Sequence, residues 1–445
     1  MRQADETRRI QLPLRIPPAY EDIPLNRFHY RIAIAGAGGQ FSDGFVLGIV
    51  GIVGIVISSA TTALGLTPLW VGLLGAATLT GLFVCALITG PIADHIGRSL
   101  VFRFDMLFIA CLSLSQFFVE EAWHLLVTRL LIGLVLGADY VVSKTLVTEH
   151  PPRHFRGRLL SFLAVAWAAG YVFAYLVGFA LHDIGDDAWR YMLIASAIPE
   201  LIVFAFRVGS PESPLWLMRR GLTDRARAIV DRTAGKDIPL PPTSGTEQPR
   251  AKFSVLFGPQ YRSRTLVGIT LYVCQVIPYF ALGTFSPLVM ESLGVTNKLA
   301  AGALYNVFLL TGAIIGMVII DRLPCRVFLI YSFFIGAVAL FASFALVLAA
   351  AANLEFTYPP EFFPTDVRAS GLGLVTAGSR IGSAISTFFL PIIVSGFGVN
   401  TVLFGCVGVL VIGGLACWRW APETRRRSFV EQDADLPAPP PVSSE

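Results

Sequence analysis

The chain has 445 residues, of which 54% are apolar and only 14% are charged, and its mean hydropathy is +0.67. A water-soluble protein of this size has no core large enough to hide so much apolar surface. The composition therefore excludes an ordinary soluble domain and predicts that lipid is the solvent for much of the surface. The net charge of +4 does not indicate nucleic-acid binding, because the placement of the basic residues follows a membrane topology.

The first 30 residues are polar and proline-bearing. They lack an apolar run followed by a small-residue cleavage site, so we expect no cleaved signal peptide. We predict that 1–30 is a cytoplasmic tail and that the first span inserts by itself.

Membrane-spanning helices need about 20 mostly apolar residues. Ten such runs follow one another along the chain. They cover 31–59, 69–93, 101–120, 123–147, 159–182, 190–209, 265–291, 299–320, 370–395 and 399–420.

The longest polar stretch, 210–264, separates the first six runs from the remainder. Its arginines have the spacing of surface helices, and a Pro/Gly/Ser-rich segment follows them. We therefore predict five regions. These are the tail 1–30, a six-helix bundle over 31–209, a cytoplasmic linker over 210–264, a second six-helix bundle over 265–420, and a disordered cytoplasmic tail over 421–445.

The basic residues set the predicted orientation. Of the 34 Lys and Arg residues, only Arg190 and Lys298 fall in loops on the side opposite the N-terminus. Because positive charge concentrates on the cytoplasmic side, both termini are expected to be cytoplasmic.

The two halves repeat one another, as in duplicated transporter folds. Glu149 precedes Arg156 by seven residues, and Glu361 precedes Arg368 by the same interval. The Gly-x-x-x-Asp-x-x-Gly-Arg motif over 90–98 also has a degraded counterpart over 316–326.

The repeat exposes a deletion in the second half. Asp94 lies 55 residues before Glu149, whereas Asp321 lies only 40 before Glu361. The missing residues correspond to about 22 Å of helix, so two full crossings and a turn do not fit. A single crossing would reverse the charge bias, which leaves two short helices, a re-entrant hairpin or no crossing in 326–362. We predict two short helices.

Several motifs together resemble the major facilitator superfamily, from about Asn26 to Glu431. The 90–98 motif resembles its inner-loop signature, and Pro-Glu-Ser-Pro at 211–214 and Pro-Glu-Thr at 422–424 resemble sugar-porter marks. The segments 129–140, 358–368 and 379–382 resemble the branch of proton-linked metabolite, aromatic-acid, phosphate and organic-cation carriers.

This resemblance implies an all-α polytopic membrane protein, with two six-helix bundles and here a shortened hairpin of helices 9 and 10. It also implies secondary transport by alternating access. One departure is that relatives often carry Asp-x-x-Asp in the first span, whereas Asp43 is followed three residues later by Val46.

The resemblance also implies an ionic latch on the inner side that opens and closes during transport. The matching residues are Asp94, Arg98, Glu149, Arg156, Glu212, Asp321, Glu361 and Arg368. The alternative is that these charges only anchor helix ends at the membrane edge.

Two carboxylates are placed near the middle of the membrane. Asp43 lies 12 residues past Arg31, and Asp139 lies 10 past Arg129 on a span that runs the other way. Burying an ionised carboxylate in the membrane costs free energy unless the group is protonated, forms an ion pair or is hydrated. Both residues are therefore candidates for proton coupling. The alternative is a permanent ion pair of Asp139 with Arg129 or Lys144.

Arg380 is predicted to lie deep in the eleventh span, where no acid occurs between 370 and 420. Its partner is therefore an anionic ligand or an acid from elsewhere, such as Glu355 or Glu361. Aromatic and amide side chains supply the remainder of a predicted central binding site. They are Tyr140, Trp167, Tyr171, Tyr272, Gln275, Tyr279, Asn306, Asn353 and Glu355.

No phosphate-binding loop, Ser-His-Asp pattern or HExxH motif is present, so we expect neither an enzyme nor ATP-driven transport. The six cysteines lack metal-site or disulfide-framework spacing. No metal and no cofactor are predicted.

The leading hypothesis is proton-coupled uptake of a small organic acid across a bacterial inner membrane. The predicted partners are a small-molecule substrate, protons and the lipid bilayer, with the protein acting as a monomer. A sugar or polyol porter is the alternative that the Pro-Glu-Ser-Pro mark favours. A non-transporting sensor or degenerate remnant is the alternative that the deletion favours.

Overall fold

The structure is a computed structural model, and it describes residues 20, 23–59, 68–150, 155–240, 253–258, 261–284, 298–320, 324–339, 363 and 368–421. Within these ranges all regular structure is helical. The first half contains α1 (Arg27–Ser59), α2 (Pro68–Ile96), α3 (Arg98–Ser115) with the short η2 (Gln116–Phe118), α4 (Ala122–Glu149), α5 (Arg156–Leu181), α6 (Ala188–Ile194) and α7 (Ala197–Arg207).

The linker and the second half are helical as well. They contain α8 (Pro214–Arg219), α9 (Thr223–Thr233), η3 (Phe253–Phe257), α10 (Arg262–Thr284), α12 (Lys298–Ile320), α13 (Cys325–Ala339), α15 (Arg368–Phe397) and α16 (Val399–Trp420).

Each of the ten predicted spans coincides with described helix, although the sixth is divided into α6 and α7. Pro199 explains this division, because it has no N–H to donate to the carbonyl of Ala195, where the helix is interrupted. In the region 326–362, α13 is one helix, but 340–362 lies outside the described residues. The predicted second short helix there stays a prediction.

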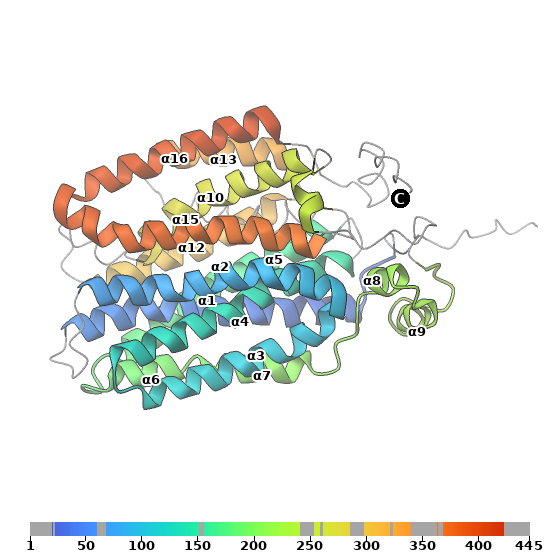
Figure 1. The fold of residues 1–445 in the computed structure, drawn as a ribbon, viewed down its shortest axis with the longest axis horizontal. Helices are drawn as coiled ribbons and strands as arrows, with labels where there is room; N and C mark the ends of the chain where they lie inside the picture. Colours follow the sequence, from blue (N-terminus) through green and yellow to red (C-terminus); the bar gives the residue numbers. More distant parts are fainter. Residues whose placement is uncertain are drawn as a thin grey trace, which may run out of the picture.

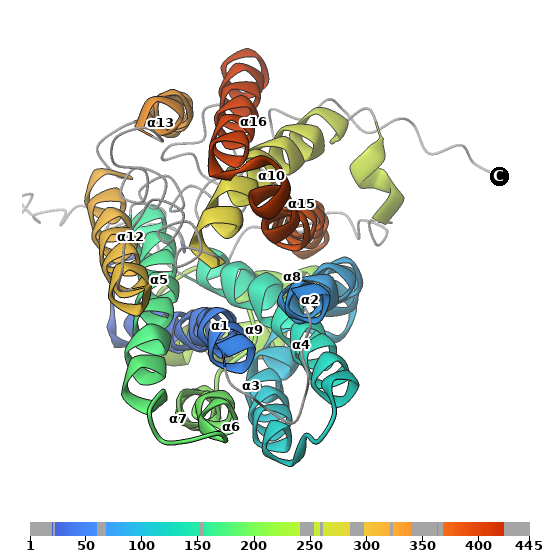
Figure 2. The same cartoon turned by 90° about the vertical axis from the view of Figure 1, so that its left-hand side faces the viewer.

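The helices form two bundles that lie side by side along the long axis of the molecule (Figure 1). The first contains α1 to α7 and the second α10 to α16, while α8 and α9 lie at one end, called here the α8–α9 end. Viewed along the bundles, α2 lies beside α15 and α5 beside α12 (Figure 2). These two helix pairs carry the main contacts between the halves.

Large apolar side chains cover the outside of both bundles. Examples with more than half of their surface exposed are Phe108, Phe173, Ile198 and Phe404. Nine described segments are also long and apolar enough to cross a membrane. The chain is a multi-pass membrane protein whose lipid-facing surface replaces the polar exterior of a soluble protein.

Glycines let neighbouring helices touch backbone to backbone. A Cβ atom on Gly44 of α1 would lie 2.0 Å from the carbonyl oxygen of Trp167, and one on Gly170 of α5 would lie 1.9 Å from that of Phe41. The α2–α4 pair has the same construction, since a Cβ on Gly133 would lie 2.1 Å from the Thr78 oxygen.

We expect Gly170→Leu to destabilise the protein by about 3 kcal/mol, because the side chain has no space and backbone cannot move aside as a flexible side chain can. Thermal unfolding of detergent-solubilised protein measures this loss. Gly405→Leu is the matched control, because Gly405 is exposed and nothing lies near its Cβ position. Equal melting temperatures for the two variants would contradict the expectation.

Candidate functional site

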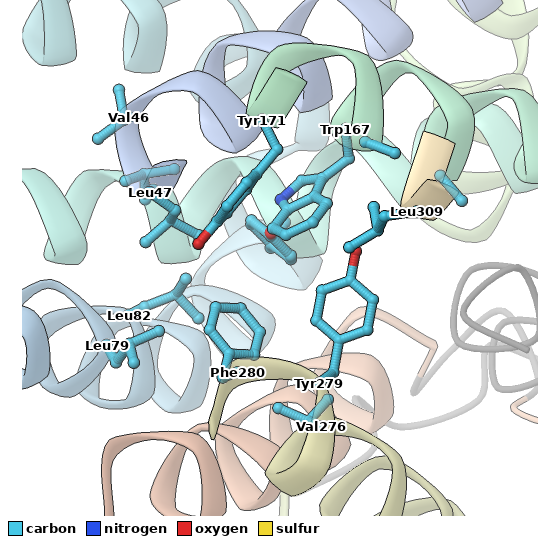
Figure 3. Packing of buried hydrophobic residues seen from close by; sticks show 14 of the residues in the cluster. Val46, Leu47, Leu79, Leu82, Trp167, Tyr171, Val276, Tyr279, Phe280 and Leu309 are labelled. Atoms are coloured by element: carbon cyan, nitrogen blue, oxygen red, sulfur yellow. The ribbon is translucent and has the colours of Figure 1, made fainter. Parts of the chain in front are cut away.

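A buried cluster of aromatic and polar side chains lies between the two halves. Trp167 of α5 faces Tyr279 and Phe280 of α10, with ring centroids 5.6 and 6.1 Å apart. Tyr171 packs beside Trp167 at 5.1 Å. Figure 3 shows these four rings facing one another from helices of opposite halves. The structure therefore brings together three of the predicted binding residues, Trp167, Tyr171 and Tyr279, with Phe280, which the sequence analysis did not select.

Arg380 of α15 contacts this cluster, with its guanidinium group over the faces of two aromatic rings. Its guanidinium carbon lies 4.9 Å from the ring centroid of Tyr140 and 5.2 Å from that of Phe280. Only 2% of Arg380 is exposed, and its Nε and Nη1 atoms form no hydrogen bond with any described residue. A buried guanidinium needs an anion or hydrogen-bond acceptors to offset its lost hydration.

Two buried amides on α10 and α12 of the second half have hydrogen-bonding capacity that the described residues do not use. Both amide atoms of the buried Gln275 lack a partner among the described residues. Asn306 donates to the carbonyl oxygen of Gly302 in its own helix at 2.8 Å, which leaves its own oxygen without a partner there. The Nε1 atom of Trp167 also has no hydrogen-bond partner among the described residues. Because unpaired buried polar atoms are costly, these atoms mark their helices, together with the aromatic contacts across the halves, as a candidate binding site.

A second buried cluster holds the predicted proton-coupling acids within the first half. Gln40 donates to Asp43 at 3.1 Å and to Asp139 at 3.2 Å, so one amide bridges the two carboxyl groups. The guanidinium of Arg207 lies 2.7 Å from Asp139 and 2.9 Å from Asp105. Two buried carboxyl groups thus contact one buried guanidinium, and the third carboxyl group, that of Asp43, joins them through Gln40.

This carboxylate cluster differs from the ion pairs that the sequence left open. Asp139 pairs with Arg207 of α7, and neither of the two basic residues considered as its partner, Arg129 or Lys144, makes a described ion pair with it. Asp105 and Arg207 were not selected as site residues, although each is a charged residue inside an apolar run. Such a position is the signal by which the sequence could have identified them.

Most of the predicted latch residues meet at the α8–α9 end. Glu149 at the end of α4 forms an ion pair with Arg98 of α3 at 3.2 Å and accepts a hydrogen bond from Arg368 of α15 at 3.4 Å. Asp94 of α2 pairs with Arg98 at 3.2 Å and also accepts from the Ser370 hydroxyl and backbone N–H at 2.7 and 3.2 Å. The contacts of Glu149 with Arg368 and of Asp94 with Ser370 connect the two halves, and Arg98, Glu149 and Arg368 are buried.

Glu212 has a different partner within the same region. Its carboxylate accepts from the backbone N–H groups of Arg98 and Ser99 at 3.1 and 3.0 Å, and so caps the first turn of α3. The cap residue, Gly97, has no side chain for this purpose and a φ of 103°. Arg156, another predicted latch residue, is buried and is the first residue of α5. Asp321, Asn353 and Glu361 lie outside the described residues.

Comparisons with known proteins agree with this architecture. The chain matches the sequence profile of the family described as "Sugar (and other) transporter" over residues 32–354 and 335–436. It is 38% identical to the inner membrane metabolite transport protein YgcS of Escherichia coli K12, over 93% of this chain and 96% of that protein. The chain belongs to this transporter family.

Further similarities of this transporter are more distant. It is 27% identical to the niacin transporter NiaP of Acinetobacter baylyi, over 84% of this chain and 88% of that protein. Its fold is similar to that of the proton:xylose symporter XylE bound to a bromo-deoxyglucose, with a TM-score of 0.78, 18% identity and coverage of 92% and 98%. The transporter therefore has the major facilitator fold, is a secondary transporter of metabolites, and is not an enzyme.

Proposed function

We propose that this transporter carries out proton-coupled uptake of a small organic acid by alternating access. The observation that carries the proposal is Arg380, a buried guanidinium at the interface between the halves, two of whose nitrogen atoms have no hydrogen-bond partner among the described residues. Trp167, Gln275 and Tyr279 lie around the same interface and supply an apolar wall and hydrogen bonds for the body of the acid. A carboxylate bound by the guanidinium would offset the cost of its burial.

The carboxylate cluster supports the proton part of the proposal. Asp43 accepts a hydrogen bond from Gln40, and within the described part of the chain it has no ion pair and its Oδ1 atom has no hydrogen-bond partner. It is therefore the carboxyl group free to take up and release a proton, while Asp139 and Asp105 hold Arg207.

Helix α4 links this cluster to the binding site. Asp139 and Ser143, which are hydrogen-bonded at 2.6 Å, lie on one face, and Tyr140 with Lys144 lies on the next face, about 100° around the helix. A change of charge at Asp139 thus acts on the helix that presents Tyr140 to Arg380.

The placement of basic residues supports an inner-membrane location with both termini in the cytoplasm. The α8–α9 end would then face the cytoplasm, and the ion pairs of Glu149 would form the inner latch. We further propose that the chain acts as a monomer, because each chain holds one complete binding site between its own halves.

A ligand screen tests the proposed substrate class. Purified protein in detergent is heated with small carboxylates, phosphate, sugars and organic cations, and a ligand that binds only the folded state raises the melting temperature. Carboxylates are expected to raise it for the unaltered protein and not for Arg380→Gln. Arg190→Gln, at a partly exposed arginine outside this interface, is the matched control. A shift with sugars alone would reject the proposal in favour of a sugar or polyol porter.

A second experiment tests coupling at Asp43. In proteoliposomes with an imposed proton gradient, we expect Asp43→Asn to reduce concentrative uptake of the best-binding carboxylate by more than tenfold. Exchange of labelled for unlabelled carboxylate without a gradient should remain, since asparagine retains the hydrogen bond to Gln40 but carries no proton. Asp183→Asn, at an exposed acid, is the control. Equal losses of uptake and exchange in Asp43→Asn would contradict a role in coupling.

The sugar or polyol alternative has its own supporting observation. Neither amide atom of Gln275 has a partner in the part of the chain that the structure describes, and an amide that both donates and accepts suits a hydroxyl-bearing ligand. Among the relatives, the minor myo-inositol transporter IolF of Bacillus subtilis is 28% identical over 84% of this chain.

A further inference from the structure

The amide of Gln40 lies between the carboxyl groups of Asp43 and Asp139. Its Nε2 atom donates to Asp43 within α1 at 3.1 Å and to Asp139 of α4 at 3.2 Å. None of the three side chains has exposed surface. Helix α1 comes very close to the carboxylate cluster here, because a Cβ atom on the preceding residue, Gly39, would overlap the guanidinium of Arg207. The backbone of α1 thus places the amide of Gln40 inside the cluster.

The two acids differ in what stabilises their ionised forms. The Oδ1 atom of Asp139 accepts from Ser143 at 2.6 Å and lies 2.7 Å from Arg207. For Asp43, the Gln40 amide is the one donor other than a carboxyl group within the described part of the chain. Asp43 and Asp139 also lie close enough to share a hydrogen bond, which requires that one of them carries a proton. A protonated Asp43 is therefore stabilised by Asp139, whereas an ionised Asp43 depends on Gln40.

We propose that Gln40 is a positioning residue that allows Asp43 to release its proton. This inference rests on the proposed function and adds a residue to its coupling step. While Asp43 is protonated, its carboxyl group donates to Asp139. When the proton passes to water on the cytoplasmic side, two carboxylates face each other across α1 and α4, and they repel one another in a low-dielectric interior. The Nε2 atom carries two hydrogens, one for each carboxylate, so it holds both ionised groups at once.

Replacing Gln40 leaves the charges around Asp43 unaltered. Besides Asp139 of α4, the charged groups that act on Asp43 are Asp105 of α3 and Arg207 of α7. Helices α2, α5 and α6 also pack on α1, but their charged residues lie in the last turn of α2 and the first turns of α5 and α6. A change in the protonation of Asp43 on replacement of Gln40 therefore reports the lost hydrogen bonds.

Infrared spectroscopy of the full-length protein in membranes tests the inference without a substrate. The carboxyl stretching band of protonated Asp43 is identified as the band that Asp43→Asn removes, and its intensity is followed as a function of pH. Gln40→Met keeps a similar volume but cannot donate. We expect it to move the midpoint of this titration upward by about one pH unit or more, because the loss of a donor disfavours the ionised form.

Two further variants make the test specific. Gln40→Lys keeps a donor and adds a positive charge beside the acids, so it should move the midpoint downward, opposite to Gln40→Met. It also tests the inference if Gln40→Met does not fold. Gln116→Met is the matched control, because Gln116 is also buried in the first half and its amide donates to the backbone oxygen of Ser113. This control should leave the midpoint unchanged.

The outcomes distinguish this inference from the proposed function. A role in packing alone would lower the melting temperature of Gln40→Met without moving the midpoint. If neither Gln40→Met nor Gln40→Lys moves the midpoint, the inference is wrong and the coupling role of Asp43 stands. If no band that Asp43→Asn removes titrates in the unaltered protein, Asp43 exchanges no proton, and both the inference and that coupling role fail.

Discussion

We expect Arg207→Met to destabilise the protein by about 3–5 kcal/mol, the cost of removing one partner from a buried ion pair. Arg207 lies within 3 Å of both Asp105 and Asp139, and none of the three side chains is more than 1% exposed. It also donates to the backbone oxygens of Ala35 and Phe102, so it connects α1, α3, α4 and α7. Methionine fills a similar volume but leaves carboxyl groups without a counter-charge.

Thermal unfolding in detergent measures this loss, and two further variants identify its cause. Arg190→Met removes a partly exposed arginine that is 3.0 Å from the exposed Asp187, and solvent-screened pairs of this kind contribute less than about 1 kcal/mol. The triple variant Arg207→Met/Asp105→Asn/Asp139→Asn should regain part of the lost stability, because the uncompensated acids are gone. A triple variant no more stable than Arg207→Met alone would show that lost packing, rather than charge, is responsible.

The second large effect is expected at Glu149, whose carboxylate lies between two buried guanidinium groups. Glu149→Gln keeps the shape but removes the charge that offsets Arg98 and Arg368. A hydrogen bond to a charged group contributes about 1.5–3 kcal/mol. The equilibrium between closed and open arrangements of the α8–α9 end should therefore shift toward the open one by about tenfold or more.

Distances between spin labels can measure this shift. Labels at Leu100 of α3 and Val327 of α13, both exposed, report the separation of the halves when the native cysteines are replaced. Glu121→Gln changes an exposed acid at the opposite end of the same helix and should leave the distances unchanged. Restoring the charge balance with Glu149→Gln/Arg368→Gln should return part of the closed population. Unchanged distances in Glu149→Gln would mean that these charges only anchor helix ends.

The sequence predicted the helices better than their contacts, for a physical reason. Span positions follow from local composition, because lipid demands about 20 apolar residues wherever a helix crosses. The interruption between α6 and α7 has a local cause as well, Pro199, although it was not predicted. The sequence can therefore predict correctly that a residue is buried in a helix without predicting which residues it contacts.

The side-chain partners could not be read from spacing along the chain. Asp139 and Arg207 are 68 residues apart, and they meet only because α4 and α7 have a particular rotation and axial offset. The predicted depth in the membrane did not distinguish Arg129 from Lys144 as the ion-pair partner of Asp139. The contact of Asp94 with Ser370 was missed for the same reason, because serine carries no charge that would mark it.

Helix α4 contributes residues to the carboxylate cluster, the binding site and the latch, so a movement of this helix affects all three. Its backbone touches α2 where Gly133 faces Thr78, which makes that contact a natural pivot. Glu149 lies 16 residues farther along, about 24 Å from the pivot at the rise of an α-helix. A tilt of about 5° at Gly133 would move Glu149 by about 2 Å, enough to separate it from Arg98. A rearrangement too small to disturb the packing at the middle of the membrane can therefore open the end of the molecule.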